Sequence, residues 1–327
     1  MQRRHAVRTM LALGAAPFAA SAQPAPPKIG RLVRIGWLGT PWGMSHKSSL
    51  TGFRHGMNDL GWREGRDWVI EVRQGERADA AALTAELVQA KVELIVTQGP
   101  MILDAHKIAS TTPMVFAFSG DPVAAGLVSN LARPGGQRTG VTAMALELVG
   151  KRLELLKQAV PTLRRVALLA NPSHAGEPLE LRESQAAAQR LGLTLQYLPV
   201  RSTADVDAAF QAMLRERAEA ISAFPDASIN RHGRTIAEFA LRSRIPAISG
   251  FAEFAEDGNL MSYGPNFLQL WHRMASYADR ILKGANAGDL PVEQPTSFEL
   301  VINQATAKAL GLALPQALLL RADRVIT

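Results

Sequence analysis

The segment Thr111–Thr142, TTPMVFAFSGDPVAAGLVSNLARPGGQRTGVT, contains the pattern from which the architecture follows. Its apolar run Met114–Phe118 predicts a strand buried on both faces. In the polar turn that follows, Asp121 precedes a proline, which is typical of a helix start because the carboxylate caps free N–H groups. We therefore expect a short helix over Val123–Leu131, ended by a Gly-rich break. Such a strand, turn and helix predict a ligand-binding end of an open α/β sheet.

Strands and helices alternate on both sides of this segment. Before it, we expect strands at Leu32–Leu38, Trp68–Arg73 and Leu94–Thr97, with helices at Ser48–Leu60 and Ala78–Ala90. After it the pattern restarts, with strands expected at Arg165–Ala170, Thr194–Val200, Ala220–Phe224 and Pro246–Ser249 and helices at Leu146–Val160, Pro178–Leu191 and Ala204–Arg215. The alternation predicts two α/β lobes, each a doubly wound parallel sheet with right-handed crossovers.

The tail adds a further strand and helix after the second array. We expect a strand at Leu260–Gly264, a long helix at Phe267–Lys283 and a strand at Phe298–Ile302. This pattern indicates that the chain crosses back between the lobes, and several crossings make a hinge. The expected boundaries are 31–140 plus about 260–293 for the N-terminal lobe, and 141–259 plus about 294–327 for the C-terminal lobe.

The first 22 residues have the composition of an export signal. Three arginines among the first eight residues precede an uncharged run of small residues, Thr9–Ala20, and Ala20–Ala22 fits the small-x-small cleavage rule. The arginine pair at positions 3 and 4 resembles a twin-arginine signal, and the ordinary secretory route stays open. We expect a signal peptide at 1–22, a Pro-rich lead-in at 23–30, and a location in the periplasm.

Charge and cysteine content exclude several classes of protein. The net charge of +7 falls to about +4 without the export segment, and the basic residues form no run or aromatic-interleaved stripe. We therefore expect no nucleic-acid partner. The chain has no Cys, which excludes disulfides, thiolate metal sites, a Cys nucleophile and a lipid-anchoring Cys. A soluble, monomeric periplasmic protein without a lipid anchor fits this composition.

Motifs of enzymes and cofactor sites are missing from the sequence. It contains no G-x-G-x-x-G, no G-x-x-x-x-G-K-[ST], no H-E-x-x-H, no G-x-S-x-G and no S-x-x-K. The seven histidines are scattered singly and none has the spacing of a metal pair, so each is interpreted as a surface or packing residue. We expect no cofactor, no metal and no catalytic residue.

Polar turns at the ends of the expected strands are the candidate ligand contacts. Because the carboxyl ends of parallel strands line one edge of a sheet, turns from both lobes can face one cleft. Asp121 and Asp226 either cap helices or contact ligand, Asn171 either holds a turn or contacts ligand, and the aromatic candidates either pack or stack. The candidates are Thr40, Trp42, Thr97, Gln98, Ser119, Asp121, Thr142, Asn171, Asp226 and Phe251.

Long blocks of the sequence resemble a known family. They include REGRDWVIEVR, PMVFAFSGDPVAAGLVSNLARPGGQRTGVT, MSYGPN, ADRILKGANAGDLPVEQPTSFELVINQATAKALGL and ADRVI. The chain resembles the ABC-transporter substrate-binding proteins that include tryptophan-binding members, over essentially its whole mature length. The resemblance implies a type I periplasmic-binding fold with three hinge crossings, a ligand enclosed between the lobes, and delivery to an ABC permease in the inner membrane.

The sequence thus favours a solute receptor of an ABC importer that is not an enzyme. The expected hinge lies near Thr139–Thr142, Gly258–Tyr263 and Gln294–Thr296. The expected ligand is a small organic molecule such as an amino acid or related carboxylate. Two alternatives stay open: a ligand sensor for a membrane signalling protein, and a small hydrolase or transferase that uses Asp121 and Asp226 as acid–base groups.

Overall fold

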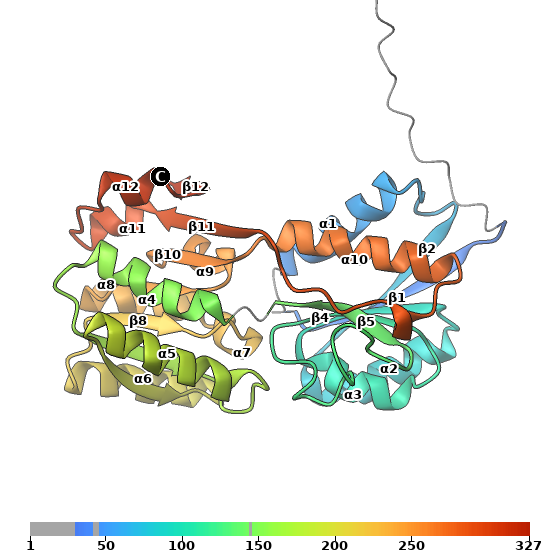
Figure 1. The fold of residues 1–327 in the computed structure, drawn as a ribbon, viewed down its shortest axis with the longest axis horizontal. Helices are drawn as coiled ribbons and strands as arrows, with labels where there is room; N and C mark the ends of the chain where they lie inside the picture. The colour runs from blue at the N-terminus through green and yellow to red at the C-terminus, as the bar shows by residue number, and fades with distance from the viewer. Residues whose placement is uncertain (1–29, 42–45, 144–145) are drawn as a thin grey trace, which may run out of the picture.

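Two lobes lie side by side, each built on one sheet with helices on both faces (Figure 1). The structure is a computed structural model, and it describes residues 30–41, 46–143 and 146–327. The expected signal peptide, nearly all of the Pro-rich lead-in and Trp42 lie outside the described residues. In the described ranges, no helix combines the length and the apolar character needed to cross a bilayer.

The N-terminal lobe has a parallel sheet of five strands in the order β2-β1-β3-β4-β5. Its strands are β1 (Val33–Gly39), β2 (Trp68–Gln74), β3 (Leu94–Gln98), β4 (Met114–Phe118) and β5 (Arg138–Thr142). One face carries α1 (His46–Asp59) and α10 (Phe267–Leu282), and the other carries α2 (Ala80–Gln89) and α3 (Ile102–Ile108). Short helices η1 (Arg77–Asp79), η2 (Gly99–Met101) and η3 (Ala287–Asp289) complete it.

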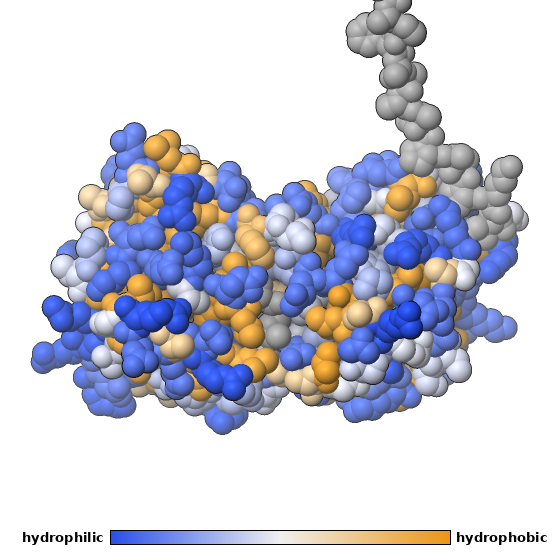
Figure 2. Space-filling model, in the orientation of Figure 1, coloured by the Kyte–Doolittle hydropathy of each residue, from blue (hydrophilic) through white to orange (hydrophobic). Residues whose placement is uncertain are grey.

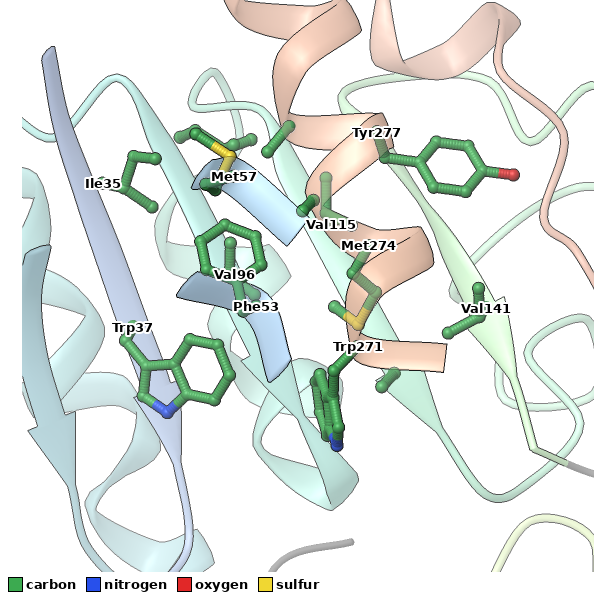
Figure 3. Close-up of a cluster of buried hydrophobic side chains, with 14 of the residues drawn as sticks. Ile35, Trp37, Phe53, Met57, Val96, Val115, Val141, Trp271, Met274 and Tyr277 are labelled. Atoms are coloured by element: carbon green, nitrogen blue, oxygen red, sulfur yellow. The ribbon is translucent and has the colours of Figure 1, made fainter. Parts of the chain in front are cut away.

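Aromatic packing between β1, α1 and α10 holds this lobe together (Figure 3). Trp37 of β1 lies with its ring centroid 5.8 Å from Phe53 of α1 and 5.5 Å from Trp271 of α10. The two helices approach closely, because a Cβ added at Gly56 would lie 2.7 Å from the Ala275 Cβ. A helix from late in the chain is therefore an integral part of the first lobe's core.

The C-terminal lobe has a sheet of seven strands in the order β12-β11-β10-β9-β8-β6-β7. They are β6 (Arg165–Ala170), β7 (Thr194–Pro199), β8 (Ala220–Ala223), β9 (Ala247–Ser249), β10 (Met261–Pro265), β11 (Phe298–Asn303) and β12 (Arg324–Ile326). All neighbours are parallel except β10 and β11. The helices are α4 (Glu147–Ala159), α5 (Glu177–Leu191), α6 (Thr203–Arg215), α7 (Ala227–Asn230), α8 (Gly233–Ser243), α9 (Ala252–Glu256), α11 (Gln304–Ala309) and α12 (Gln316–Leu319).

Three connections cross between the lobes and lie next to one another. They run from β5 to α4, from β10 to α10, and from Glu293 to β11. The Thr142 N–H donates to the Glu293 carbonyl at 2.9 Å, and the Asn266 N–H donates to the Ser297 carbonyl at 3.1 Å. These backbone bonds tie the first crossing to the third and the second to the third, so the lobes share one narrow hinge.

Two expectations about the chain path are wrong. Met261–Pro265 does not begin the return to the N-terminal lobe, because it pairs with β9 and β11 inside the C-terminal sheet. The return therefore begins at Asn266, and Gly258–Tyr263 is not a hinge segment. The expected hinge segment Thr139–Thr142 lies within β5, and the first crossing starts directly after it. The expected segment Gln294–Thr296 does lie in the third crossing.

A third expectation, the helix over Val123–Leu131, is also wrong. The segment forms a single turn, which ends at Gly126 with φ +69°. The Leu127 N–H donates to the Pro122 carbonyl at 2.9 Å, the bond that closes a turn when glycine takes the left-handed conformation. Asp121 caps this turn, because its Oδ1 accepts the Val123 and Ala124 N–H groups at 2.8 and 3.1 Å.

Candidate ligand-binding cleft

A cavity of about 160 Å³ lies between the lobes and is lined by both of them. The N-terminal lobe supplies Thr40, Glu76, Arg77, Pro100, Leu103, Phe118 and Ser119. The C-terminal lobe supplies Asn171, Ser173, His174, Ala175, Asp226, Ala227, Ser228 and Arg231. Most of these residues directly follow the carboxyl ends of strands, as a ligand site in a doubly wound sheet requires.

Larger grooves lie elsewhere on the molecule. One of about 390 Å³ runs beside the hinge segments, and one of about 610 Å³ lies at the far end of the C-terminal lobe, around α11 and the chain end. Neither contains the turns that follow the central strands. Apolar residues also gather on both sides of the junction between the lobes on the face shown in Figure 2. Position at the strand ends therefore favours the smaller cavity as the ligand site.

The polar wall of the cleft in the C-terminal lobe is built around Asp226. This residue caps α7, because its Oδ1 accepts the Ser228 N–H at 2.9 Å and also the Ser228 hydroxyl. The Asn171 side-chain amide donates to the same Oδ1 at 3.2 Å. Within the described residues, every hydrogen bond to the Asp226 side chain ends on Oδ1, so Oδ2 remains available to a positively charged group in the cavity.

Opposite this wall, the N-terminal lobe carries buried polar atoms that lack partners among the described residues. They are the hydroxyls of Thr40 and Thr97 and both side-chain atoms of the Gln98 amide. Thr40 lines the cavity directly, at the end of β1. Arg77, beside it, uses its Nε to donate to Asp104 at 3.1 Å, and it also lines the cavity. Because a buried polar group without a partner is costly, Thr40 is a candidate ligand contact.

Two polar contacts join the lobes across the cleft. His174, in the turn after β6, lies with its Nε2 2.9 Å from the Ser119 hydroxyl, which follows β4. The Gly176 N–H donates to His174 Nδ1, so the proton of this neutral ring is on Nε2, which donates to Ser119. At the mouth, Arg231 lies 3.5 Å from Glu76. These contacts hold the lobes in a closed arrangement.

A buried arginine and a buried glutamate lie beneath the wall of the C-terminal lobe. Arg152 of α4 and Glu180 of α5 lie 3.9 Å apart with side chains 3% exposed, and Glu180 Oε2 is also 3.9 Å from His174. Burial raises the pKa of the Glu180 carboxyl to about 8, against the opposing effect of the Arg152 guanidinium. Burial lowers the pKa of His174, against the opposing charges of Asp226 and Glu177. At neutral pH, burial beneath the cleft therefore favours the uncharged forms of Glu180 and His174.

The structure brings four of the predicted site residues to the cavity: Thr40, Ser119, Asn171 and Asp226. Thr97 and Gln98 are buried at the end of β3 in the N-terminal lobe and do not line it. Asp121 caps a turn, and the Thr142 hydroxyl donates to the Gly120 carbonyl at 3.0 Å. Phe251 packs edge-on against Phe267 of α10 at 5.2 Å in the core of the N-terminal lobe, so it is not a stacking face for ligand.

Sequence reasoning missed several residues that line the cavity. In the sequence, Arg77 and Arg231 belong to no basic run, and the pattern predicts a surface or packing role for His174. His174 stands three residues after Asn171 in the same strand-end turn, which is the signal that could have identified it. Among the described residues, no group of acidic or histidine side chains could hold a metal ion.

Comparison with known families decides the class. Residues 43–326 match the family model described as ABC transporter substrate binding protein. The chain belongs to this family. Its members are binding proteins, and the assignment is to a non-enzymatic class.

Two proteins to which this chain is similar bind an aromatic amino acid. The tyrosine-binding protein of Clostridioides difficile (strain R20291) is 23% identical over 264 residues, which cover 80% of this chain and 76% of that protein. An ABC domain from Streptococcus pneumoniae, solved in complex with L-Trp, superposes with a TM-score of 0.83 at 25% identity, covering 90% of this chain and 100% of that one. A conserved domain protein from Vibrio cholerae superposes with a TM-score of 0.82 at 25% identity, covering 90% of this chain and 99% of that one.

Proposed function

We propose that this ABC transporter substrate-binding protein binds an aromatic amino acid in the cleft between its lobes and delivers it to an ABC permease. The observation that carries the proposal is a cavity with a carboxylate on one lobe and a hydroxyl and a guanidinium on the other. The tyrosine-binding and L-Trp-bound relatives support the choice of ligand class.

The charges of a zwitterion fit this arrangement. On the C-terminal lobe, Asp226 Oδ2 accepts hydrogen bonds from the ligand ammonium, and Asn171 holds the carboxylate in place through Oδ1. On the N-terminal lobe, the Thr40 hydroxyl and the Arg77 guanidinium donate to the ligand carboxylate. Charge-assisted hydrogen bonds of this kind are stronger than neutral ones. The ammonium and the carboxylate of the ligand thus contact different lobes.

The apolar part of the ligand fits the N-terminal side of the cavity. Pro100, Leu103 and Phe118 line it there, and Ala175 of the opposite lobe packs against the buried cluster that contains Phe118. An aromatic side chain buries a large apolar area in such a place, whereas a short side chain leaves part of it unfilled. This supports an aromatic ligand over a small one.

Because the proposed ligand contacts come from both lobes, binding should close the cleft. A ligand that touches both lobes stabilises the closed state by its differential affinity for that state, and the narrow three-segment hinge lets the lobes move as units. The permease then distinguishes the liganded protein from the unliganded one by its shape.

A thermal-shift screen with matched ligand analogues tests the proposal. We expect L-tyrosine or L-tryptophan to raise the melting temperature, since a ligand at 100 times its Kd stabilises by about 2.7 kcal/mol. Tyramine and tryptamine lack the carboxylate, and the corresponding arylpropionates lack the ammonium, so each should produce little shift at the same concentration. Equal shifts from the amino acid and either analogue would contradict the zwitterion assignment.

Two arginine variants test whether Arg77 belongs to the ligand site. Arg77→Met should weaken amino-acid binding roughly tenfold, because it removes a charged hydrogen-bond donor to the carboxylate. Arg215→Met is the matched control, since Arg215 is 71% exposed at the end of α6 and outside the cavity. Equal affinity in both variants would remove Arg77 from the site.

The location in the periplasm is part of the same proposal. The arginine-led segment at 1–22 supports export, and cleavage after Ala22 would leave the mature receptor in the compartment where an importer collects its substrate. Mass spectrometry of the periplasmic fraction should give a chain that begins at Gln23. Replacement of Arg3 and Arg4 by Lys should block export by the twin-arginine route, and normal export of that variant would indicate the ordinary secretory route.

A further inference from the structure

We infer that His174 is a positioning residue for lobe closure: in its neutral form it donates a hydrogen bond to Ser119 of the opposite lobe, and its protonation opens the cleft and weakens ligand binding. The inference rests on the proposed function, because it takes closure around a ligand as the event that His174 stabilises. It assigns a role to a histidine for which the sequence predicted only a surface or packing role.

The geometry fixes the proton of His174 on the nitrogen that faces the N-terminal lobe. The Nε2–Ser119 Oγ distance is 2.9 Å, and the Phe118 ring lies 6.2 Å from the imidazole. On the other side of the ring, the Gly176 N–H donates to Nδ1 at 3.3 Å. A proton added at Nδ1 would face this N–H group, so protonation breaks the bond that orients the ring.

The burial of His174 depends on closure. Its side chain is 7% exposed, and the N-terminal lobe covers it with Phe118 and Ser119, which carry no charge. Opening of the cleft removes that cover and exposes the ring to water. Desolvation of the charged form is thus a property of the closed state, and the open state accepts a proton more readily.

Among the described residues, the charges that act on the His174 pKa belong to the C-terminal lobe, although Glu76 and Arg77 of the N-terminal lobe line the same cavity. Asp226 at the start of α7 and Glu177 on α5 favour the protonated ring, but burial outweighs them. Glu180 lies 3.9 Å from Nδ1, with Arg152 of α4 on its other oxygen. Burial raises the pKa of Glu180 to about 8, so below that pH its carboxyl is mostly neutral and does not stabilise a charged His174.

The direction of the pH effect follows from linkage. The closed state has the lower His174 pKa and binds fewer protons than the open state, so closure is favoured above the ordinary histidine pKa of 6.5. As pH falls below that value, the open state gains protons and the closed population declines. Glu180 stays inside the C-terminal lobe in both states, so it changes folding stability and contributes little to closure.

Distance measurement between spin labels tests this directly. The chain has no Cys, so Ile108→Cys on α3 and Leu214→Cys on α6 label one exposed position in each lobe. Pulsed dipolar EPR should show that the short-distance population decreases between about pH 7.5 and about pH 5.5, with or without L-tyrosine. Titration calorimetry over the same range should show the Kd for L-tyrosine rising roughly threefold to tenfold.

His174→Gln separates hydrogen bonding from titration. The glutamine amide can donate to Ser119 but does not protonate, so in this variant the closed population and the Kd for L-tyrosine should be the same at both pH values. Ser119→Ala should weaken closure at the higher pH, because His174 then has no partner on the N-terminal lobe. His272→Gln is the matched control, since His272 is half exposed beside Asp59, and it should retain the wild-type pH response.

Each outcome decides the inference. A distance distribution that is the same at both pH values overturns it, whether or not L-tyrosine or L-tryptophan binds. A pH response that persists unchanged in His174→Gln also overturns it. Failure of both amino acids to bind contradicts the proposed function instead, and the label distances of the unliganded protein then still report whether His174 controls opening.

Discussion

A residue in the cleft can use one side-chain atom within the fold and leave another without a partner, and Asp226 shows this most clearly. Its Oδ1 caps α7 and accepts from Asn171, while Oδ2 accepts no hydrogen bond from the described residues and is the oxygen that we propose binds the ligand. The choice between helix cap and ligand contact, which the sequence left open, is therefore a choice between two oxygens of one carboxylate. Sequence patterns predict the residue at the strand end, but they cannot tell which of its atoms the fold already uses.

Asp226→Asn tests the ligand contact with the cap retained. The amide oxygen can still accept the Ser228 N–H, so stability should change little. Loss of the charge should weaken amino-acid binding by about 1–3 kcal/mol. Asp226→Ala should in addition lose about 1 kcal/mol of stability through the cap. Titration calorimetry and melting curves on both variants measure these effects, and unchanged affinity in Asp226→Asn would remove Asp226 from the site.

Glu180 gives the fold a measurable pH dependence. Its pKa is raised in the folded state to about 8, from 4.5, so the unfolded state holds fewer protons at neutral pH. The free energy of unfolding should therefore decrease as pH rises towards about 8. Urea unfolding between about pH 7 and pH 9, where His174 is neutral, isolates this effect. The decrease should be smaller in Glu180→Gln, and an equal slope in both proteins would show that Glu180 is ionised in the fold.

At the scale of elements, the sequence predicts most strands and helices because apolar periodicity and glycine ends are local signals. Arg165–Ala170 and Met114–Phe118 form strands with the expected bounds. The predicted helix over Val123–Leu131 does not form, because Gly126 within this segment takes the left-handed conformation and ends the turn. The β10 strand was assigned to the wrong lobe, since strand pairing is a long-range property that no local pattern contains.

The contact of α1 with α10 makes a specific prediction about Gly56. Alanine normally stabilises a helix interior by about 1 kcal/mol over glycine. At this position the added Cβ would lie 2.7 Å from the Ala275 Cβ and 2.9 Å from the His272 carbonyl oxygen, so overpacking of about 1–3 kcal/mol outweighs the gain. We expect a lower melting temperature for Gly56→Ala. Thr51→Ala, at an exposed position of the same helix, is the control and should be nearly neutral.

On the scale of the whole molecule, the lobes and the hinge determine what the cleft can do. The sequence predicts two lobes and a return crossing, and the structure adds which segments meet: those after β1, β2, β3 and β4 of one lobe and those after β6 and β8 of the other. It also shows Arg77, Arg231 and His174 at this junction, although their sequence neighbourhoods gave little sign of it. Convergence of turns depends on how two separately folded units face each other, and single-sequence patterns do not encode that relation.

Closure around an amino acid is the central claim for the whole molecule, and small-angle X-ray scattering tests it most directly. The radius of gyration should be smaller at saturating L-tyrosine or L-tryptophan than without ligand, because the ligand connects Asp226 on one lobe to Thr40 on the other. Asp226→Asn should need a higher ligand concentration to reach the same compact state. An unchanged radius of gyration in the wild-type protein, with binding demonstrated in the same sample by calorimetry, would contradict closure and would indicate that the ligand binds to one lobe alone.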